Sequence, residues 1–203
     1  MIVKMCGLRS REAAEAAAYA GADFLGFVFW PRSRRYVEPQ AAREIGQGLG
    51  AKRVGVFVDE VPERVNEIAE MAGLDYIQLH GHEGAAYAER LCRPVIKAYR
   101  YGEDFTAEAA NAFPAEIILL DSGAGGLPGG TGQAFAWREA AAEARRVEKP
   151  LLVAGGINPA NVAEALDIFR PYGVDVSGSL EEQGEKSPRL MREFMAAVGR
   201  WKA

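Results

Sequence analysis

The chain has 203 residues, of which 49% are hydrophobic and 26% charged, and its formal net charge is -4 at pH 7. This length suits one domain with a substantial core, and the weak negative charge argues against nucleic acid or an anionic membrane as a partner. No apolar stretch is long enough to span a bilayer, and two cysteines, Cys6 and Cys92, make no disulfide framework. We therefore expect a reduced, cytoplasmic protein with no nucleic-acid or membrane partner.

Short apolar runs alternate with helix-like patterns along the whole chain. The predicted strands cover residues 2–5, 23–29, 52–58, 75–79, 94–99, 115–120, 150–155 and 173–176. The predicted helices cover residues 10–21, a segment from about residue 40, 61–73, 83–92, 107–112, 135–147, 158–169 and 187–201. We expect Ser10 to cap the first helix and Gly21 to end it. Asn158 is expected to cap the seventh, with Pro159 in its first turn.

The strand-like runs are continuously apolar, which is typical of parallel strands that are buried on both faces. Eight strand–helix pairs fit either a closed (β/α)8 barrel, the TIM barrel, or an open doubly wound sheet of the flavodoxin or Rossmann type. The number of pairs favours the TIM barrel, although the chain is short for that fold. No linker or change of composition divides the sequence, so we predict a single compact α/β domain over residues 1–203.

In a TIM barrel the active site lies at the carboxyl ends of the strands, so the residue that ends each apolar run is a candidate. Cys6 ends the first run. A lone cysteine is often only a small buried hydrophobe, but at this rim a thiol can act as a base or a nucleophile. Cys92, at the end of the fourth predicted helix, is remote from the rim and is interpreted as structural.

Asp121 ends the sixth run, directly after the apolar residues 117–120. A carboxyl group placed there costs free energy unless it is paired or functional. Such a group suits general-acid catalysis, and capping of the following segment is the plainer alternative.

The loop after the second run contains Arg32, Arg34 and Arg35. One arginine at a barrel mouth would suit an anionic substrate, because guanidinium binds carboxylate or phosphate in a bidentate manner. The fourth run ends at His80, and His82 is the only other histidine. The H-x-H spacing could indicate a metal site, but a catalytic zinc site takes about three protein ligands, often histidines, and no third histidine is available. We therefore interpret His80 as a substrate contact and His82 as a solvated residue.

Glycine-rich segments follow the last three runs. Residues 122–132 match neither a Walker loop nor a dinucleotide fingerprint, and we interpret them as a mobile lid. Gly155 and Gly156 lie at the end of the seventh run, and the Ser177–Gly178 turn follows the eighth. These are the usual phosphate positions of a TIM barrel, where backbone N–H groups bind anions. The sequence contains no cofactor motif, so we predict that no cofactor is required.

One base, one acid and a phosphate anchor suit the isomerisation of a sugar phosphate, which needs only proton transfer between neighbouring carbons. The segments KMCG, GADFLGFVFWPRSRRYV, RVGVFVDE, IQLHG, ILLDS, GGTGQAFAW, VAGGINPANV and GVDVSGSLE occur in this order. Over essentially the whole chain they resemble the phosphoribosylanthranilate isomerases of tryptophan biosynthesis.

The resemblance implies a cofactor-free Amadori rearrangement of a small phosphoribosyl substrate. N-(5'-phosphoribosyl)anthranilate would become 1-(2-carboxyphenylamino)-1-deoxyribulose 5-phosphate. Cys6 would remove the proton from ribose C2', Asp121 would protonate the furanose ring oxygen, and Arg35 would hold the anthranilate carboxylate. The other expected substrate contacts are His80, Gly130, Gly155, Gly156, Asp175, Ser177 and Gly178. Both monomers and homodimers occur in the family, so either assembly is open.

The chain departs from the family pattern in two places. SGSLE stands where S-S-G-[VI]-E is usual, so Gly178 and Ser179 look exchanged, and GEKSP stands where G-x-K-D is common.

Related barrels are alternatives. An indole-glycerol-phosphate synthase would need lysines inside the barrel, and the predicted strands hold only Lys4 and Lys97; a ribulose-phosphate epimerase would need metal-binding histidines. A barrel that only binds a phosphometabolite would need neither the thiol nor the carboxyl group.

Overall fold

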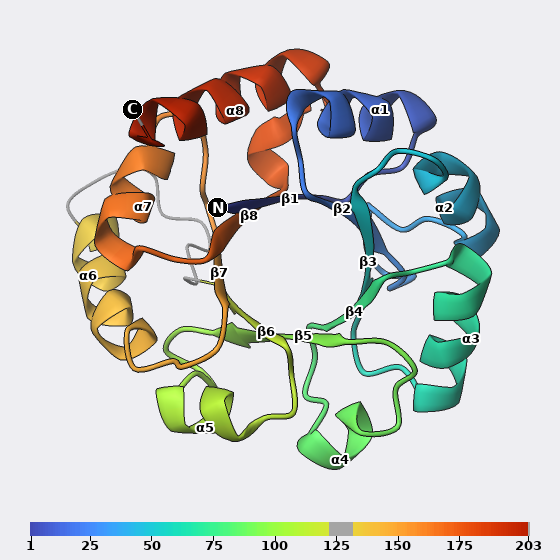
Figure 1. The fold of residues 1–203 in the computed structure, drawn as a ribbon, viewed down its shortest axis with the longest axis horizontal. Coiled ribbons are helices and arrows are strands. Elements are labelled where there is room, and N and C mark those ends of the chain that lie inside the picture. The colour runs from blue at the N-terminus through green and yellow to red at the C-terminus, as the bar shows by residue number, and fades with distance from the viewer. Residues whose placement is uncertain (122–131, 203) are drawn as a thin grey trace.

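The structure is a computed structural model that describes residues 1–121 and 132–202. Within these residues, eight parallel strands form a closed barrel in the order β1 to β8, and the helices form a ring around it (Figure 1). The strands are β1 Ile2–Cys6, β2 Phe24–Val28, β3 Lys52–Phe57, β4 Tyr76–Leu79, β5 Val95–Arg100, β6 Ile117–Asp121, β7 Leu151–Ala154 and β8 Gly173–Val176. Because β1 pairs with both β2 and β8, the predicted TIM barrel is confirmed and the open sheet is wrong.

The outer ring consists of helices that alternate with the strands. They are α1 Arg11–Ala20, α2 Pro39–Gly46, α3 Pro62–Ala72, α4 Ala85–Ala88, α5 Ala107–Ala112, α6 Gly132–Ala144, α7 Val162–Phe169 and α8 Pro188–Lys202. Ser10 caps α1 as predicted, because its side-chain oxygen accepts a hydrogen bond from the N–H of Ala13, and Gly21 ends the helix. No helix in the described part of the chain is long and apolar enough to cross a membrane.

The predicted start of α7 is wrong. Asn158 and Pro159 lie in a turn, and the helix begins only at Val162. The Oδ1 of Asn158 accepts a hydrogen bond of 3.2 Å from the N–H of Asn161, which favours a local turn over a helix. The Nδ2 of Asn161 in turn donates to the carbonyl of Gly156 at 3.0 Å. The two asparagines therefore shape the loop after β7.

The fourth helix is shorter than predicted, and a side chain of α3 explains why. Asn66 donates from Nδ2 to the carbonyl of Arg90 and accepts at Oδ1 from the N–H of Cys92, both at 2.9 Å. These bonds hold the segment after Ala88 in a turn. Cys92 is consequently exposed and outside the helix.

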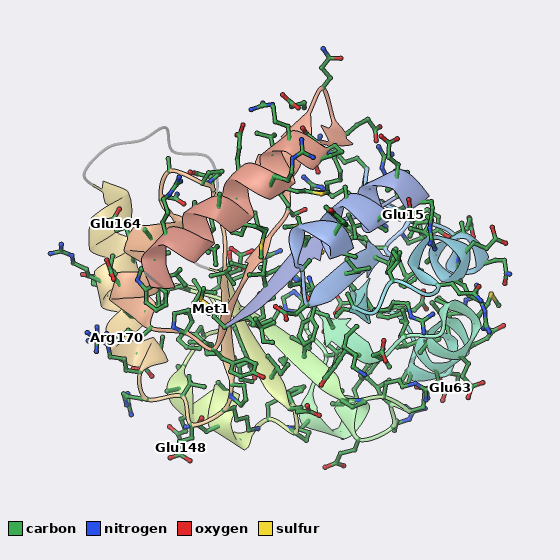
Figure 2. The ribbon with its side chains drawn as sticks, turned by 45° about the horizontal axis from the view of Figure 1, so that its top comes forward. Met1, Glu15, Glu63, Glu148, Glu164 and Arg170 are labelled. Carbon is green, nitrogen blue, oxygen red and sulfur yellow. The ribbon has the colours of Figure 1, made fainter. Side chains whose placement is uncertain are left out.

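The apolar side chains form two layers, one inside the barrel and one between the barrel and the helices. The inner layer consists of Phe24, Val54, Ile96, Ala98, Ile117, Leu119, Leu152 and Ala154. In β1 the alternation of a strand places Val3 and Met5 in the outer layer and Cys6 with interior residues. Charged side chains such as Glu15, Glu63 and Glu164 point outward from the helices (Figure 2).

A hairpin that the sequence analysis did not predict follows the eighth strand. After the short helix η1 Gly178–Leu180, strands β9 Glu181–Glu182 and β10 Glu185–Lys186 pair in antiparallel fashion. The two residues between them, Gln183 and Gly184, have φ values of 52° and 85°. Positive φ at both central residues is the signature of a tight I' turn. This hairpin adds a rim beside the carboxyl ends of β1 and β8.

Candidate active site

A cavity of about 430 Å³ opens at the carboxyl ends of the barrel strands. Of the predicted site residues, Gly130 lies outside the described residues. All the others line this cavity: Cys6, Arg35, His80, Asp121, Gly155, Gly156, Asp175, Ser177 and Gly178. The fold thus brings together residues from the two ends and the middle of the chain, as the barrel interpretation predicted.

Cys6 is the last residue of β1 and is 8% exposed. Its thiol lies beside Val28 and Val56, which form an apolar wall of the cavity. Gly26 is its register partner in β2, and a Cβ atom on Gly26 would lie 2.8 Å from the Sγ of Cys6. Glycine at this strand position therefore leaves the space that the thiol occupies.

A buried ion pair lies one step deeper in the barrel. Lys4 is fully buried, and its Nζ lies 3.0 Å from Oδ1 of Asp175 on β8. Burial by itself lowers the pKa of Lys4, but the charges and hydrogen bonds of Asp175 and Cys6 outweigh burial and raise it. Lys4 is therefore a cation beside the thiol. The other strand lysine, Lys97, is also buried and pairs with Glu83 at 3.0 Å.

Asp121 and His80 lie at the ends of β6 and β4. Asp121 is half-buried and His80 follows the last strand residue. Burial lowers the pKa of His80, although the nearby charge of Asp121 raises it in part. The imidazole is therefore neutral at pH 7. Gln78, within β4, places its Nε2 3.0 Å from Nδ1 of His80.

Arg35 reaches the cavity from the loop after β2 and forms a bidentate pair with Glu181 of the unpredicted hairpin. Its Nε and Nη2 donate to the two carboxylate oxygens of Glu181 at 2.6 and 3.2 Å. Arg34 and Lys186 bind the same carboxylate at 2.6 and 3.0 Å. Burial raises the pKa of Glu181, but the hydrogen bonds from Arg35 and Lys186 outweigh burial and lower it. Among the described residues, Nη1 of Arg35 has no hydrogen-bond partner.

The loops after β7 and β8 are joined at the cavity edge. Gly155 and Gly156 have φ values of 86° and 66°, so their conformation favours glycine. The hydroxyl of Ser179 donates to the carbonyl of Ile157 at 2.6 Å. The hydroxyl of Ser177 donates to the carbonyl of Cys6 at 3.0 Å. Both serine side chains thus bind backbone carbonyls. The order of Gly178 and Ser179 is exchanged relative to the family pattern, and in this order Ser179 has a structural role.

Several cavity residues were missed by the sequence analysis. They include Trp30, Ser33, Gln78 and Arg100. Gln78 could have been found as the polar residue inside an apolar run, and Arg100 because β5 extends one residue further than predicted. His82 is exposed, and its N–H donates to Asp59. The described residues contain no group of three or more histidine, cysteine, aspartate or glutamate side chains arranged to hold a metal ion.

Comparisons with known proteins agree with this fold. The family profile of N-(5'phosphoribosyl)anthranilate (PRA) isomerase matches residues 3–197. The N-(5'-phosphoribosyl)anthranilate isomerase of Desulforamulus reducens is 45% identical over 97% of this chain and 94% of its own length. The crystal structure of the Thermus thermophilus enzyme is 37% identical, with a TM-score of 0.86 and coverage of 98% of this chain and 99% of that one.

A second solved isomerase was determined in complex with reduced 1-(o-carboxyphenylamino)-1-deoxyribulose 5-phosphate. It is 33% identical to this chain, with a TM-score of 0.81 and coverage of 98% of this chain and 100% of that one. Because the family profile and the relatives span nearly the full length, the chain belongs to the N-(5'-phosphoribosyl)anthranilate isomerase family.

Proposed function

We propose that Cys6 is the general base and Asp121 the general acid in the isomerisation of N-(5'-phosphoribosyl)anthranilate, the aldose–ketose step of tryptophan biosynthesis. The observation that carries this assignment is that both side chains line one cavity, from strands that are not neighbours in the barrel. Two groups held apart on a rigid barrel can act on different atoms of one substrate.

The proton transfers follow from these roles. Asp121 donates a proton to the furanose ring oxygen, the C1'–O4' bond breaks, and the nitrogen lone pair forms the C1'=N bond of a Schiff base. Cys6 then removes the proton from C2', and the C2'–H electrons form a C1'=C2' bond while the C=N electrons return to nitrogen. The resulting enolamine tautomerises to the 2-ketose, 1-(2-carboxyphenylamino)-1-deoxyribulose 5-phosphate.

Arg35 and the two glycine-containing loops would hold the charged ends of the substrate. Glu181 occupies the Nε–Nη2 edge of Arg35, so the Nη1 end of the guanidinium is left for the anthranilate carboxylate. The serine hydroxyls at residues 177 and 179 are engaged with backbone carbonyls. The phosphate would therefore be bound by the backbone N–H groups of Gly156 and Gly178, because backbone N–H groups in such turns form anion-binding concavities. His80, Gly155 and Asp175 complete the proposed contacts in the cavity, and Gly130 is proposed as a further one.

The assignment is tested with the variants Cys6→Ser and Asp121→Asn. Their turnover is measured from the loss of substrate fluorescence. Each variant should lower kcat by about 100-fold or more, because one proton-transfer group is removed. Binding of the reduced product analogue should persist in both. Cys92→Ser is the matched control, because Cys92 is exposed and outside the cavity, and it should keep wild-type turnover. Wild-type kcat in either cavity variant would show that the roles are wrong.

We further propose that the enzyme acts in the cytoplasm on this small molecule, without nucleic acid. A homodimer is one of two assemblies to be distinguished, and one Thermotoga maritima enzyme of the family is described as dimeric. Light scattering at several concentrations separates a 22.0 kDa monomer from a dimer.

A further inference from the structure

The cavity contains a buried polar side chain to which the proposed mechanism gives no role. Gln78 lies within β4 and is 1% exposed. Its chain neighbours, Ile77 and Leu79, belong to the layer beneath the helices, so Gln78 faces the barrel interior and lines the cavity. Burying an amide without compensating hydrogen bonds costs about 1–3 kcal/mol, so a glutamine at this position needs bonding partners.

The first partner is His80. The Nε2 of Gln78 lies 3.0 Å from Nδ1 of the imidazole. An amide nitrogen can only donate, so Nδ1 accepts, and the neutral ring must carry its proton on Nε2. Burial lowers the pKa of His80, which keeps the ring neutral at pH 7 and makes the tautomer decisive. Gln78 therefore determines which ring nitrogen of His80 is a hydrogen-bond donor.

The second partner is missing from the protein. The Oε1 of Gln78 is a buried acceptor with no hydrogen-bond partner among the described residues. Gln78 and His80 both line the cavity, so a molecule bound there can reach this acceptor. An acceptor requires a donor, and the hydroxyl groups of a ribosyl phosphate are donors, whereas an ionised carboxylate has no proton to give.

We propose that Gln78 is a positioning and specificity-determining residue: its Nε2 holds His80 as the Nε2–H tautomer, and its Oε1 accepts a hydrogen bond from a sugar hydroxyl of the substrate. The second half of this statement rests on the proposed function, because it takes the cavity as the site of the ribosyl phosphate. The opposite amide orientation would place a proton on Nδ1, so the tautomer distinguishes the two arrangements.

The tautomer is measured by long-range 1H–15N correlation of the ring nitrogens at pH 7, without ligand. The chain has two histidines, and His82→Gln assigns the signals while leaving His80 in place. In the wild type, Nδ1 of His80 should be unprotonated and Nε2 protonated. In Gln78→Met no donor from position 78 faces Nδ1 of His80, so the tautomer with a protonated Nδ1 should appear beside the other one. A protonated Nδ1 in the wild-type protein, or a single Nε2–H tautomer retained in folded Gln78→Met, overturns the positioning role.

The hydroxyl contact is measured with Gln78→Met, which keeps the side-chain length and removes both polar atoms. The probes are the reduced product analogue and counterparts that each lack one sugar hydroxyl. Wild-type protein should bind one of these deoxy compounds about tenfold more weakly, the effect of one lost hydrogen bond, and Gln78→Met should bind it and the parent analogue equally. The same discrimination in both proteins overturns the contact. Neither measurement requires turnover, so failure of the acid and base assignments would be seen separately.

Discussion

Arg35 lies directly against the backbone of Gly7: a Cβ atom on Gly7 would be 2.4 Å from Cδ of Arg35. Gly7 follows Cys6 and has a φ of 80°, in the left-handed region that favours glycine. The residue after the proposed base therefore leaves room for the proposed carboxylate anchor. Gly7 thus connects the proposed base, Cys6, with the proposed carboxylate anchor, Arg35.

We expect Gly7→Ala to displace Arg35 and raise KM about tenfold, which corresponds to about 1.4 kcal/mol. Stability should also fall by about 1–2 kcal/mol, because alanine resists the left-handed conformation. Gly48→Ala is the matched control: its φ is 76°, and no atom lies within 4 Å of the added Cβ. The control should lose similar stability in urea unfolding and keep its KM. Equal KM values in both variants would contradict the packing argument.

Arg35→Lys keeps the positive charge but removes the Nη1 end of the guanidinium, the proposed contact of the anthranilate carboxylate. KM should rise by about 10- to 100-fold while kcat changes little, because the carboxylate contact is made equally in the ground state and the transition state. Arg34→Lys is the control, since Arg34 binds the same Glu181 but does not line the cavity. Steady-state kinetics decide the matter, and a loss confined to kcat would argue against carboxylate binding by Arg35.

Glu181→Gln tests the hairpin carboxylate through its pH dependence. The pKa of Glu181 is lowered in the folded protein. Its charge therefore stabilises the fold above the unfolded value of about 4.3, and this contribution disappears as pH falls through the folded pKa. We expect urea unfolding to show a wild-type advantage of about 2 kcal/mol at pH 7 that narrows in acid.

The control for this prediction is Glu185→Gln in the same hairpin. The Glu185 side chain is 73% exposed and pairs with Arg9, so the substitution should change the free energy of unfolding by less than about 1 kcal/mol. A difference between wild type and Glu181→Gln that stays constant from pH 7 into acid would mean that the charge of Glu181 is not what stabilises the hairpin.

Lys4→Met should destabilise the protein by about 3–5 kcal/mol, because it leaves the carboxylate of Asp175 buried without its partner. The matched substitution Lys52→Met removes an exposed pair, with Lys52 61% exposed and 3.4 Å from Asp75. That variant should lose less than about 1 kcal/mol. Equal free energies of unfolding for the two variants would show that the buried ion pair contributes no more to stability than the exposed one.

The strands and the cavity residues at their ends could be predicted because each depends on local sequence. A buried parallel strand needs a continuous apolar run, and the barrel then fixes where the next residue lies. Cys6 and Asp121 were found in this way. The glycine-rich segment 122–131 lies outside the described residues, so its interpretation as a lid stays a prediction.

The ion pairs could not be predicted, because their partners are distant in the chain. Lys4 and Asp175 are separated by 171 residues and Arg35 and Glu181 by 146. The first pair depends on the register at which the barrel closes, and the second on a hairpin whose two short strands consist of charged residues. No apolar alternation marks such a hairpin; only the Gln183–Gly184 turn could have indicated it.

The seam between β1 and β8 joins the first and the last strand of the barrel, which are made at different times during protein synthesis. Lys4 emerges from the ribosome 171 residues before its buried partner, Asp175. Until β8 has been made, Lys4 cannot form its ion pair with Asp175 inside the barrel. The growing chain therefore cannot close its ring or complete its cavity early, and a product truncated before β8 would keep this charge in water and remain open.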